Sequence, residues 1–373
     1  MNAEPGRPAP RELFRSGELL VRAVTGFGGP VCYITFDSYT DNRTLERPGF
    51  GEPYFEGRGI DAVHVLSRDN RWYQHAELDE ALHAVAASLG DYERVIAYGS
   101  SMGGFAALRY GRVCGATVGL ALSPQYHVDP QLAPFDRRWA EDVARIAFRD
   151  DGHLPTLPLQ YVAYDPFDRE DRRHFELLAA RSHTEGVPVP HGGHPVGSYL
   201  AETDMLRGLL EGVEQGMFDR HAFAGELRDR RRRSGQYFFT LAKRVPTHRP
   251  RQKIALARLA VETQPDNPHY RNQLGAALDA VGQFDAALAE HERASAMPSA
   301  TMFQAHHLMQ HHEARGDHDR ALAIVERLIA EHPEVLWLPQ ERKRIRRKRR
   351  HRYLAGRLAS KLGLDRLLER LLY

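Results

Sequence analysis

The sequence predicts an α/β fold, with a mostly parallel sheet covered by helices on both faces, followed by an all-α helical repeat domain. Two observations support this prediction. Before residue 216, β-rich apolar runs without clear alternation recur between helical patterns. Beyond residue 250, similar residues recur 34 positions apart. The 373 residues are enough for two domains.

The expected strands are short runs rich in branched and aromatic residues, bounded by glycines, prolines or helical patterns. A helical pattern with Leu78, Leu82 and Val85 on one face precedes one of them and ends at Gly90. This alternation of strand and helix indicates a parallel sheet. The strand runs fall at 19–24, 31–36, 62–66, 94–98, 117–122, 159–164 and 187–189.

A Gly-x-Ser-x-Gly motif centred on Ser101 follows the run 94–98 and opens onto an apolar helical pattern at 105–110. The order is strand, sharp turn and helix. In such a turn the strained backbone exposes the hydroxyl, and the glycines let strand and helix approach closely. Ser101 is therefore the candidate nucleophile. The alternative is a glycine-rich turn that serves packing or binds an anion at the helix N-terminus.

An activated serine needs a base to accept its proton and an acid to orient that base. Asp165 and Asp168 follow the run 159–164, and His191 and His194 follow the run 187–189. The order serine, acid, histidine, each just after a predicted strand, favours a catalytic triad. For either aspartate, the alternative is an Asx-turn or a helix N-cap.

These motifs resemble the α/β-hydrolase superfamily. The resemblance implies that Ser101 is the nucleophile and that His194 is the base, because a Gly-His pair just past the last strand matches the family; His191 is its competitor. It also implies Asp168 as the acid, with Asp165 as the alternative if the loop is tighter. It implies no metal and no organic cofactor.

The resemblance covers residues 15–215 and further implies an oxyanion hole. One backbone N–H comes from Met102, and a second comes from Asp37 or Ser38, in the loop after the run 31–36. This loop departs from the family's His-Gly pattern. A backbone donor needs no particular side chain, but the Asp37 carboxylate must point away from a developing oxyanion.

A small cap is expected between residues 122 and 159, where the pattern predicts one helix near 138–148. We therefore expect an open cleft, which suits bulky substrates such as acylated sugars or lipid-linked intermediates. Trp72 and Tyr73 lie either at the mouth of this cleft or over a sheet edge.

The second half of the chain resembles the tetratricopeptide repeat, a helix-turn-helix unit. Leu274, Gly282, Ala287 and Ala294 recur 34 residues later as Leu308, Gly316, Ala321 and Leu328. We count two clear repeats and one doubtful repeat before them. The resemblance implies a protein or peptide partner, and the alternative is a packing and dimerisation module.

The predicted organisation has four parts. They are an α/β-hydrolase domain at 1–216, a charged linker with one helix at 217–250, repeats at 251–337, and basic amphipathic helices at 338–373. The basic run 342–350 and the leucines after it fit an anionic membrane surface. The alternative is a helix that caps the repeats. Nucleic acid is not an expected partner, because no base-reading module accompanies the charge.

Residues 1–12 contain no apolar segment typical of a secretory signal, and no run is long enough to span a membrane. The two cysteines, Cys32 and Cys114, have no metal-ligand or disulfide spacing. A cytoplasmic protein is therefore expected, with the tail at the inner membrane surface.

The sequence as a whole predicts a serine-dependent acyl ester hydrolase acting on a small-molecule or glycan ester, through Ser101, His194 and Asp168 or Asp165. Two alternatives stay open. The same residues would make an acyltransferase if a sugar hydroxyl replaced water. A repeat scaffold with an inactive hydrolase domain is the other, although the intact serine, acid and histidine argue against it.

Overall fold

The computed structural model describes residues 8–149, 154–333, 335 and 337–362, with side chains up to residue 354. The chain divides into two compact units between Tyr237 and Phe238. We call residues 1–237 the sheet unit and residues 238–373 the helical unit.

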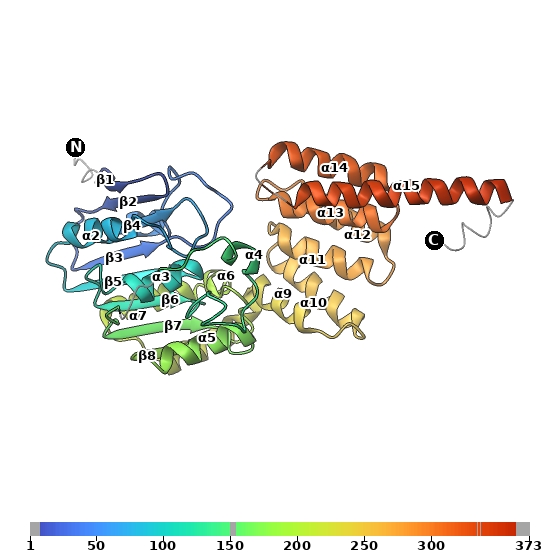
Figure 1. The fold of residues 1–373 in the computed structure, drawn as a ribbon. Helices are drawn as coiled ribbons and strands as arrows, with labels where there is room; N and C mark the ends of the chain where they lie inside the picture. Colours follow the sequence, from blue (N-terminus) through green and yellow to red (C-terminus); the bar gives the residue numbers. More distant parts are fainter. Residues whose placement is uncertain (1–7, 150–153, 334, 336, 363–373) are drawn as a thin grey trace, which may run out of the picture. The chain divides into compact units, whose positions relative to one another are not determined.

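The described part of the sheet unit contains an eight-stranded sheet in the order β1-β2-β4-β3-β5-β6-β7-β8 (Figure 1). β2 pairs antiparallel with β1 and with β4, and all other neighbours are parallel. The predicted fold class is thus confirmed. The strands are β1 (Arg11–Arg15), β2 (Leu19–Val24), β3 (Val31–Phe36), β4 (Asp61–Ser67), β5 (Arg94–Ser100), β6 (Val118–Leu122), β7 (Leu159–Tyr164) and β8 (Thr184–Pro188).

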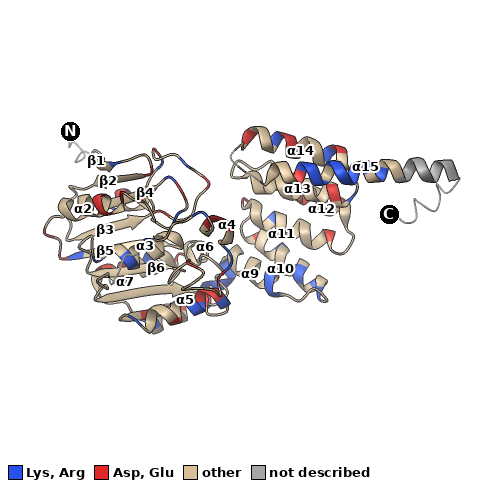
Figure 2. Cartoon of the chain, viewed as in Figure 1, with Lys and Arg blue, Asp and Glu red and all other residues tan. Residues whose placement is uncertain are grey.

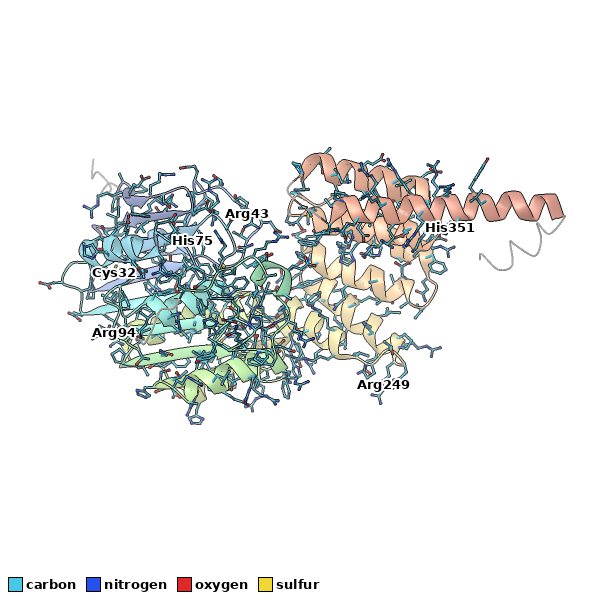
Figure 3. The ribbon with its side chains drawn as sticks, viewed as in Figure 1. Cys32, Arg43, His75, Arg94, Arg249 and His351 are labelled. Atoms are coloured by element: carbon cyan, nitrogen blue, oxygen red, sulfur yellow. The ribbon has the colours of Figure 1, made fainter. Side chains whose placement is uncertain are left out.

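Helices cover both faces of the sheet, because alternate strand residues point into two separate cores. Cys32, labelled in Figure 3, and Ile34 pack with α2, α3 and α5, whereas Tyr33 packs with α1, α6, α7 and α8. These helices are α1 (Glu52–Gly57), α2 (Leu78–Ser88), α3 (Met102–Tyr110), α5 (Arg169–Ala179), α6 (Gly197–Glu202), α7 (Met205–Gln215) and α8 (Arg220–Arg230).

Three segments differ from the sequence expectations. β1 was not predicted, because its charged and exposed residues form no apolar run. The cap helix expected at 138–148 is the single turn α4 (Ala140–Val143). The segment 217–250 holds α8, the 3-10 turn η1 (Arg231–Arg233) and α9 (Gly235–Arg244), and α8 buries Phe223 and Leu227 in the sheet unit's core. The boundaries at 216, 250 and 337 stay predictions.

The helical unit consists of successive helix pairs, as the 34-residue period predicts. Gly282 and Gly316 stand at the turns within two pairs with φ of 77° and 72°, and Ala287 and Ala321 are fully buried between helices. The glycines therefore allow the left-handed turn, and the alanines allow close packing. The helices are α10 (Pro250–Thr263), α11 (Pro268–Asp279), α12 (Phe284–Ser295), α13 (Met302–Ala314), α14 (His318–Glu331) and α15 (Leu338–Leu362).

Helix α15 carries the basic run (Figure 2). Its residues Leu338 and Ile345 are buried in one core cluster with α14. Arg344 lies 2.6 Å and Lys348 3.1 Å from Glu313 of α13. The described part of α15 therefore covers the end of the repeats, and part of its charge is neutralised there. Leucines 364–372 lie outside the described residues. None of the described helices combines the length and apolar character that a membrane crossing requires.

Candidate active site

Ser101 sits in a strained turn between β5 and α3, as predicted for the nucleophile. Its φ of 50° and ψ of −114° are rare for a residue with a side chain. A Cβ on Gly99 would lie 2.2 Å from the carbonyl oxygen of Gly103, and a Cβ on Gly103 would lie 2.2 Å from that of Phe36. Both positions therefore require glycine, and the strand and helix meet as closely as the motif predicts.

The structure brings Ser101 and His194 together. Ser101 Oγ lies 2.9 Å from His194 Nε2, within the hydrogen-bond reach that a general base needs. The competing His191 lies elsewhere. Its ring stacks on Phe167 with the ring centroids 4.6 Å apart, and its backbone N–H donates to Asp165. His194 is thus the histidine placed against the serine.

The carboxylate that faces His194 belongs to Asp171. His194 Nδ1 lies 2.8 Å from Oδ1 and 2.9 Å from Oδ2 of this residue. Asp171 is the third residue of α5, and its side chain is buried. The expectation that Asp168 or Asp165 orients the histidine is therefore not met.

Asp168 and Asp165, the two acids expected from the sequence, have structural roles near Asp171. Asp168 is the N-cap of α5, and its Oδ1 accepts a hydrogen bond from the Asp171 backbone N–H at 3.0 Å. Asp165 accepts from the backbone N–H groups of Phe167, His191 and Gly193, which holds the histidine loop against the end of β7. Asp168 is thus a helix N-cap and Asp165 stabilises an Asx-turn, as the alternatives proposed. The carboxylate that reaches the His194 imidazole is that of Asp171, in the first turn of α5.

His194 and Arg138 keep the Asp171 carboxyl ionised. Burial alone would raise the pKa of its carboxyl, but His194 and Arg138 together hold that pKa below its ordinary value. Arg138 Nη1 donates to Asp171 Oδ1 at 2.9 Å, and the same guanidinium binds both oxygens of Asp136. Asp136 in turn lies 3.0 Å from His174 Nε2. This network fixes the carboxylate and the imidazole in position.

This arrangement predicts an acid-sensitive contribution of Asp171 to stability. The folded pKa lies below the ordinary 3.8, so just below that pH the unfolded chain binds more protons than the folded chain. The contribution is full above about pH 5 and is lost progressively as the pH falls below that value. Urea unfolding of wild type and Asp171→Asn, from about pH 7 to about pH 3, should show a difference in unfolding free energy that shrinks in acid. A difference that is constant or grows in acid contradicts the assignment.

Gln125 is a site residue that the sequence analysis missed. It lies just past the end of β6, beside β5, and its Nε2 donates to Ser101 Oγ at 3.1 Å. Its Oε1 accepts from the indole N–H of Trp72 at 3.1 Å. Since the serine oxygen accepts from Gln125, its own proton is left for His194. A polar residue directly after the neighbouring parallel strand is the signal that would have found it.

The loop after β3 lies against the N-terminus of α3, as the glycine contacts above require. The Asp37 carboxylate is bound by Arg47 at 2.5 Å and by the Ser67 backbone N–H at 3.3 Å, on the β4 side, opposite β5. The Asp37 carboxylate therefore points away from Ser101. Burial raises the pKa of this carboxyl to about 6, although the charge of Arg47 lowers it in part.

Met102 is the first residue of α3, so its backbone N–H has no carbonyl partner within the helix. In the described part of the chain, the buried Ser38 Oγ has no hydrogen-bond partner.

Aromatic side chains pack beside His194. The Trp139 ring lies 5.9 Å from the His194 ring, and Tyr39 and Trp72 pack on Trp139 at 5.1 and 5.5 Å. Ser101 is only 4% exposed. Trp72 thus belongs to the site and does not cover a sheet edge. Ser101 is also more buried than the open cleft predicted from the sequence would allow.

No family model and no curated protein sequence matches this chain. Among solved structures, similarity is found to the capsule O-acetyltransferase of Neisseria meningitidis serogroup A (TM-score 0.38, 14% identity, 56% of this chain and 96% of that one). XC6422 of Xanthomonas campestris, described as an α/β serine hydrolase without lid, gives a TM-score of 0.32 and 15% identity over 51% of this chain and 87% of that one. YrrB, described as a TPR protein with an unusual peptide-binding site, gives a TM-score of 0.28 and 14% identity over 46% and 90%. These values are too low to assign the chain to a family.

Proposed function

We propose that this protein is a serine-dependent acyl ester hydrolase whose triad is Ser101, His194 and Asp171. The observation that carries the proposal is the continuous hydrogen-bonded path from Ser101 Oγ through both ring nitrogens of His194 to Asp171. A nucleophile, a base and an acid in contact on a strained turn have the geometry of acyl transfer through a covalent intermediate.

In the proposed reaction, Ser101 Oγ attacks the ester carbonyl carbon while His194 Nε2 takes the hydroxyl proton. The ionised Asp171 stabilises the imidazolium that forms. The backbone N–H groups of Met102 and of the loop at Asp37 or Ser38 are proposed to donate to the oxyanion. The intermediate then expels the alcohol, which takes the proton from His194. Water attacks the carbonyl carbon of the acyl-enzyme and gives a proton to His194 Nε2. The second tetrahedral intermediate then expels Ser101 Oγ, which takes this proton back from His194, and the acid is released.

The enclosure of Ser101 favours a small acyl group. Tyr39, Trp72 and Trp139 form an aromatic wall beside the triad, and a long acyl chain would have to displace it. We therefore propose short-chain esters, including acylated glycans, as the substrate class.

Hydrolysis of p-nitrophenyl acetate, butyrate and octanoate tests the proposal. We expect kcat/KM for the acetate to exceed that for the octanoate by about tenfold or more, since each excluded methylene is costly in a closed pocket. Trp139→Ala should narrow this gap, and Trp139→Phe, which keeps an aromatic ring, should preserve it. Equal turnover of all three esters by the wild type would contradict the small acyl pocket, and no turnover of any would contradict the hydrolase.

The same enclosure supports a second candidate, transfer of the acyl group to a sugar hydroxyl. The His194 side chain is only 12% exposed, which restricts the access of water to the acyl-enzyme. Adding a sugar to the acetate assay should then yield acetylated sugar and raise the rate of p-nitrophenol release. Release that is unaffected by sugars, with acetate as the sole product, favours the hydrolase. A peptide partner of the repeats and contact of the tail with anionic membranes stay predictions.

A further inference from the structure

A second cluster of chemically active side chains lies within the helical unit. Asp279 of α11, His291 of α12 and His311 of α13 each offer one ligand atom, and these atoms lie within 4.8 Å of one another. Both histidines are buried. The three residues come from three helices and two successive helix pairs, so local sequence does not bring them together.

The two separations that involve Asp279 are close to those of a metal site, and the two histidine nitrogens lie within 4.8 Å of each other. His291 Nε2 lies 3.2 Å from Asp279 Oδ2, and His311 Nδ1 lies 2.9 Å from Oδ1. Ligand bonds of about 2.0–2.1 Å in a tetrahedral zinc site place neighbouring ligand atoms about 3.3 Å apart. Small side-chain rotations would therefore seat one ion. Two imidazoles and a carboxylate leave a fourth position for water.

Asn272 supplies the outer contact that a ligating histidine usually has. Its Oδ1 lies 3.1 Å from His291 Nδ1, and a carbonyl oxygen only accepts, so Nδ1 carries the proton. In a neutral ring, Nε2 then presents a lone pair to the Asp279 carboxylate, and two acceptors repel unless a cation lies between them. Turning the Asn272 amide would also remove the repulsion, without a metal.

The backbone is shaped to admit the His291 ring. A Cβ added at Gly275 of α11 would lie 2.7 Å from Cε1 and 2.8 Å from Nε2 of His291. A side chain at position 275 would force this ring to shift, so the glycine lets the imidazole reach Asp279, which lies on the same helix as Gly275. In the part of the chain that the structure describes, Asn272 Nδ2 is buried without a hydrogen-bond partner, which is a further sign of an incomplete polar site.

We propose that Asp279, His291 and His311 bind one Zn²⁺ ion, with water as the fourth ligand. Binding leaves the proton of His291 on Nδ1, facing Asn272, and moves the proton of His311 to Nε2, so that neutral rings present lone pairs to the metal. The ion clamps the pair α11–α12 to α13 of the next pair. Such a clamp adds to the stability that the stacking of the helix pairs provides.

The test uses the full-length, tag-free protein stripped with a chelator. Calorimetric titration with Zn²⁺ should show one equivalent, and Co²⁺ in its place should give the intense visible absorption of four-coordinate cobalt. The double variant His291→Gln, His311→Gln should lose this site. Asn272→Ala should bind about 10- to 100-fold more weakly, as expected for an outer contact. His312→Gln is the matched control, since His312 is equally buried on the same helix but faces Asp317.

Two results would overturn the proposal. One is a wild type that binds no zinc, which would leave the turned Asn272 amide as the explanation of the cluster. The other is a double variant that keeps the wild-type stoichiometry and cobalt spectrum, which would place the ion on other histidines. If circular dichroism shows that the double variant is unfolded, the proposal is tested on the wild type alone. Its melting temperature must rise when Zn²⁺ is added and fall back when a chelator is added. Both readouts are independent of hydrolase activity.

Discussion

Ser101→Ala is expected to lower kcat for p-nitrophenyl acetate by about 10⁴- to 10⁶-fold, because it removes the group that forms the acyl-enzyme. A small residual rate should survive from binding and the oxyanion donors. The fold should persist, since the side chain at this position is short and the strain lies in the backbone. Steady-state kinetics and covalent labelling by a fluorophosphonate probe measure the effect, and both should be lost together.

Ser100→Ala is the matched control. Ser100 is the last residue of β5 and is buried to nearly the same degree as Ser101, but it is not part of the hydrogen-bonded path. Its substitution should leave kcat and labelling unchanged. Turnover at the wild-type rate in Ser101→Ala would contradict the serine mechanism, whereas a folded wild type without turnover or labelling would favour the repeat scaffold.

Asp171→Asn is expected to lower kcat by about 10⁴-fold with little change in KM. The amide can donate its NH₂ group to His194 Nδ1, which favours the ring tautomer with the proton on Nε2. That nitrogen then cannot accept the proton of Ser101. Loss of the carboxylate also removes the charge that stabilises the imidazolium. Kinetics with p-nitrophenyl acetate, in parallel with fluorophosphonate labelling, measure both effects.

The control for this prediction is Asp168→Asn. Asparagine caps a helix about as well as aspartate does, so the turn that carries Asp171 should be kept and kcat should change only a few-fold. A large loss in Asp168→Asn together with near-normal activity in Asp171→Asn would instead restore the acid that the sequence favoured. The two variants differ by one turn of the same helix and therefore separate the two assignments.

The sequence by itself determined the features that depend on residues close together in the chain or on a regular repeat. The apolar runs of β2 to β7, the elbow around Ser101 with its two required glycines, and the 34-residue period are local patterns, because strand, turn and helix geometry depend on residues a few positions apart. The choice of His194 over His191 also followed from its immediate neighbour, Gly193.

Only the tertiary structure decided which groups meet. Asp171 reaches His194 because α5 starts at the Asp168 N-cap and turns its third residue toward the β8 loop. Gln125 reaches Ser101 because β6 lies beside β5 in the sheet. His311 of α13 meets Asp279, which comes from another repeat. Strand order and helix rotation arise from packing of the whole core, so residues far apart in the chain share a site that no local pattern specifies.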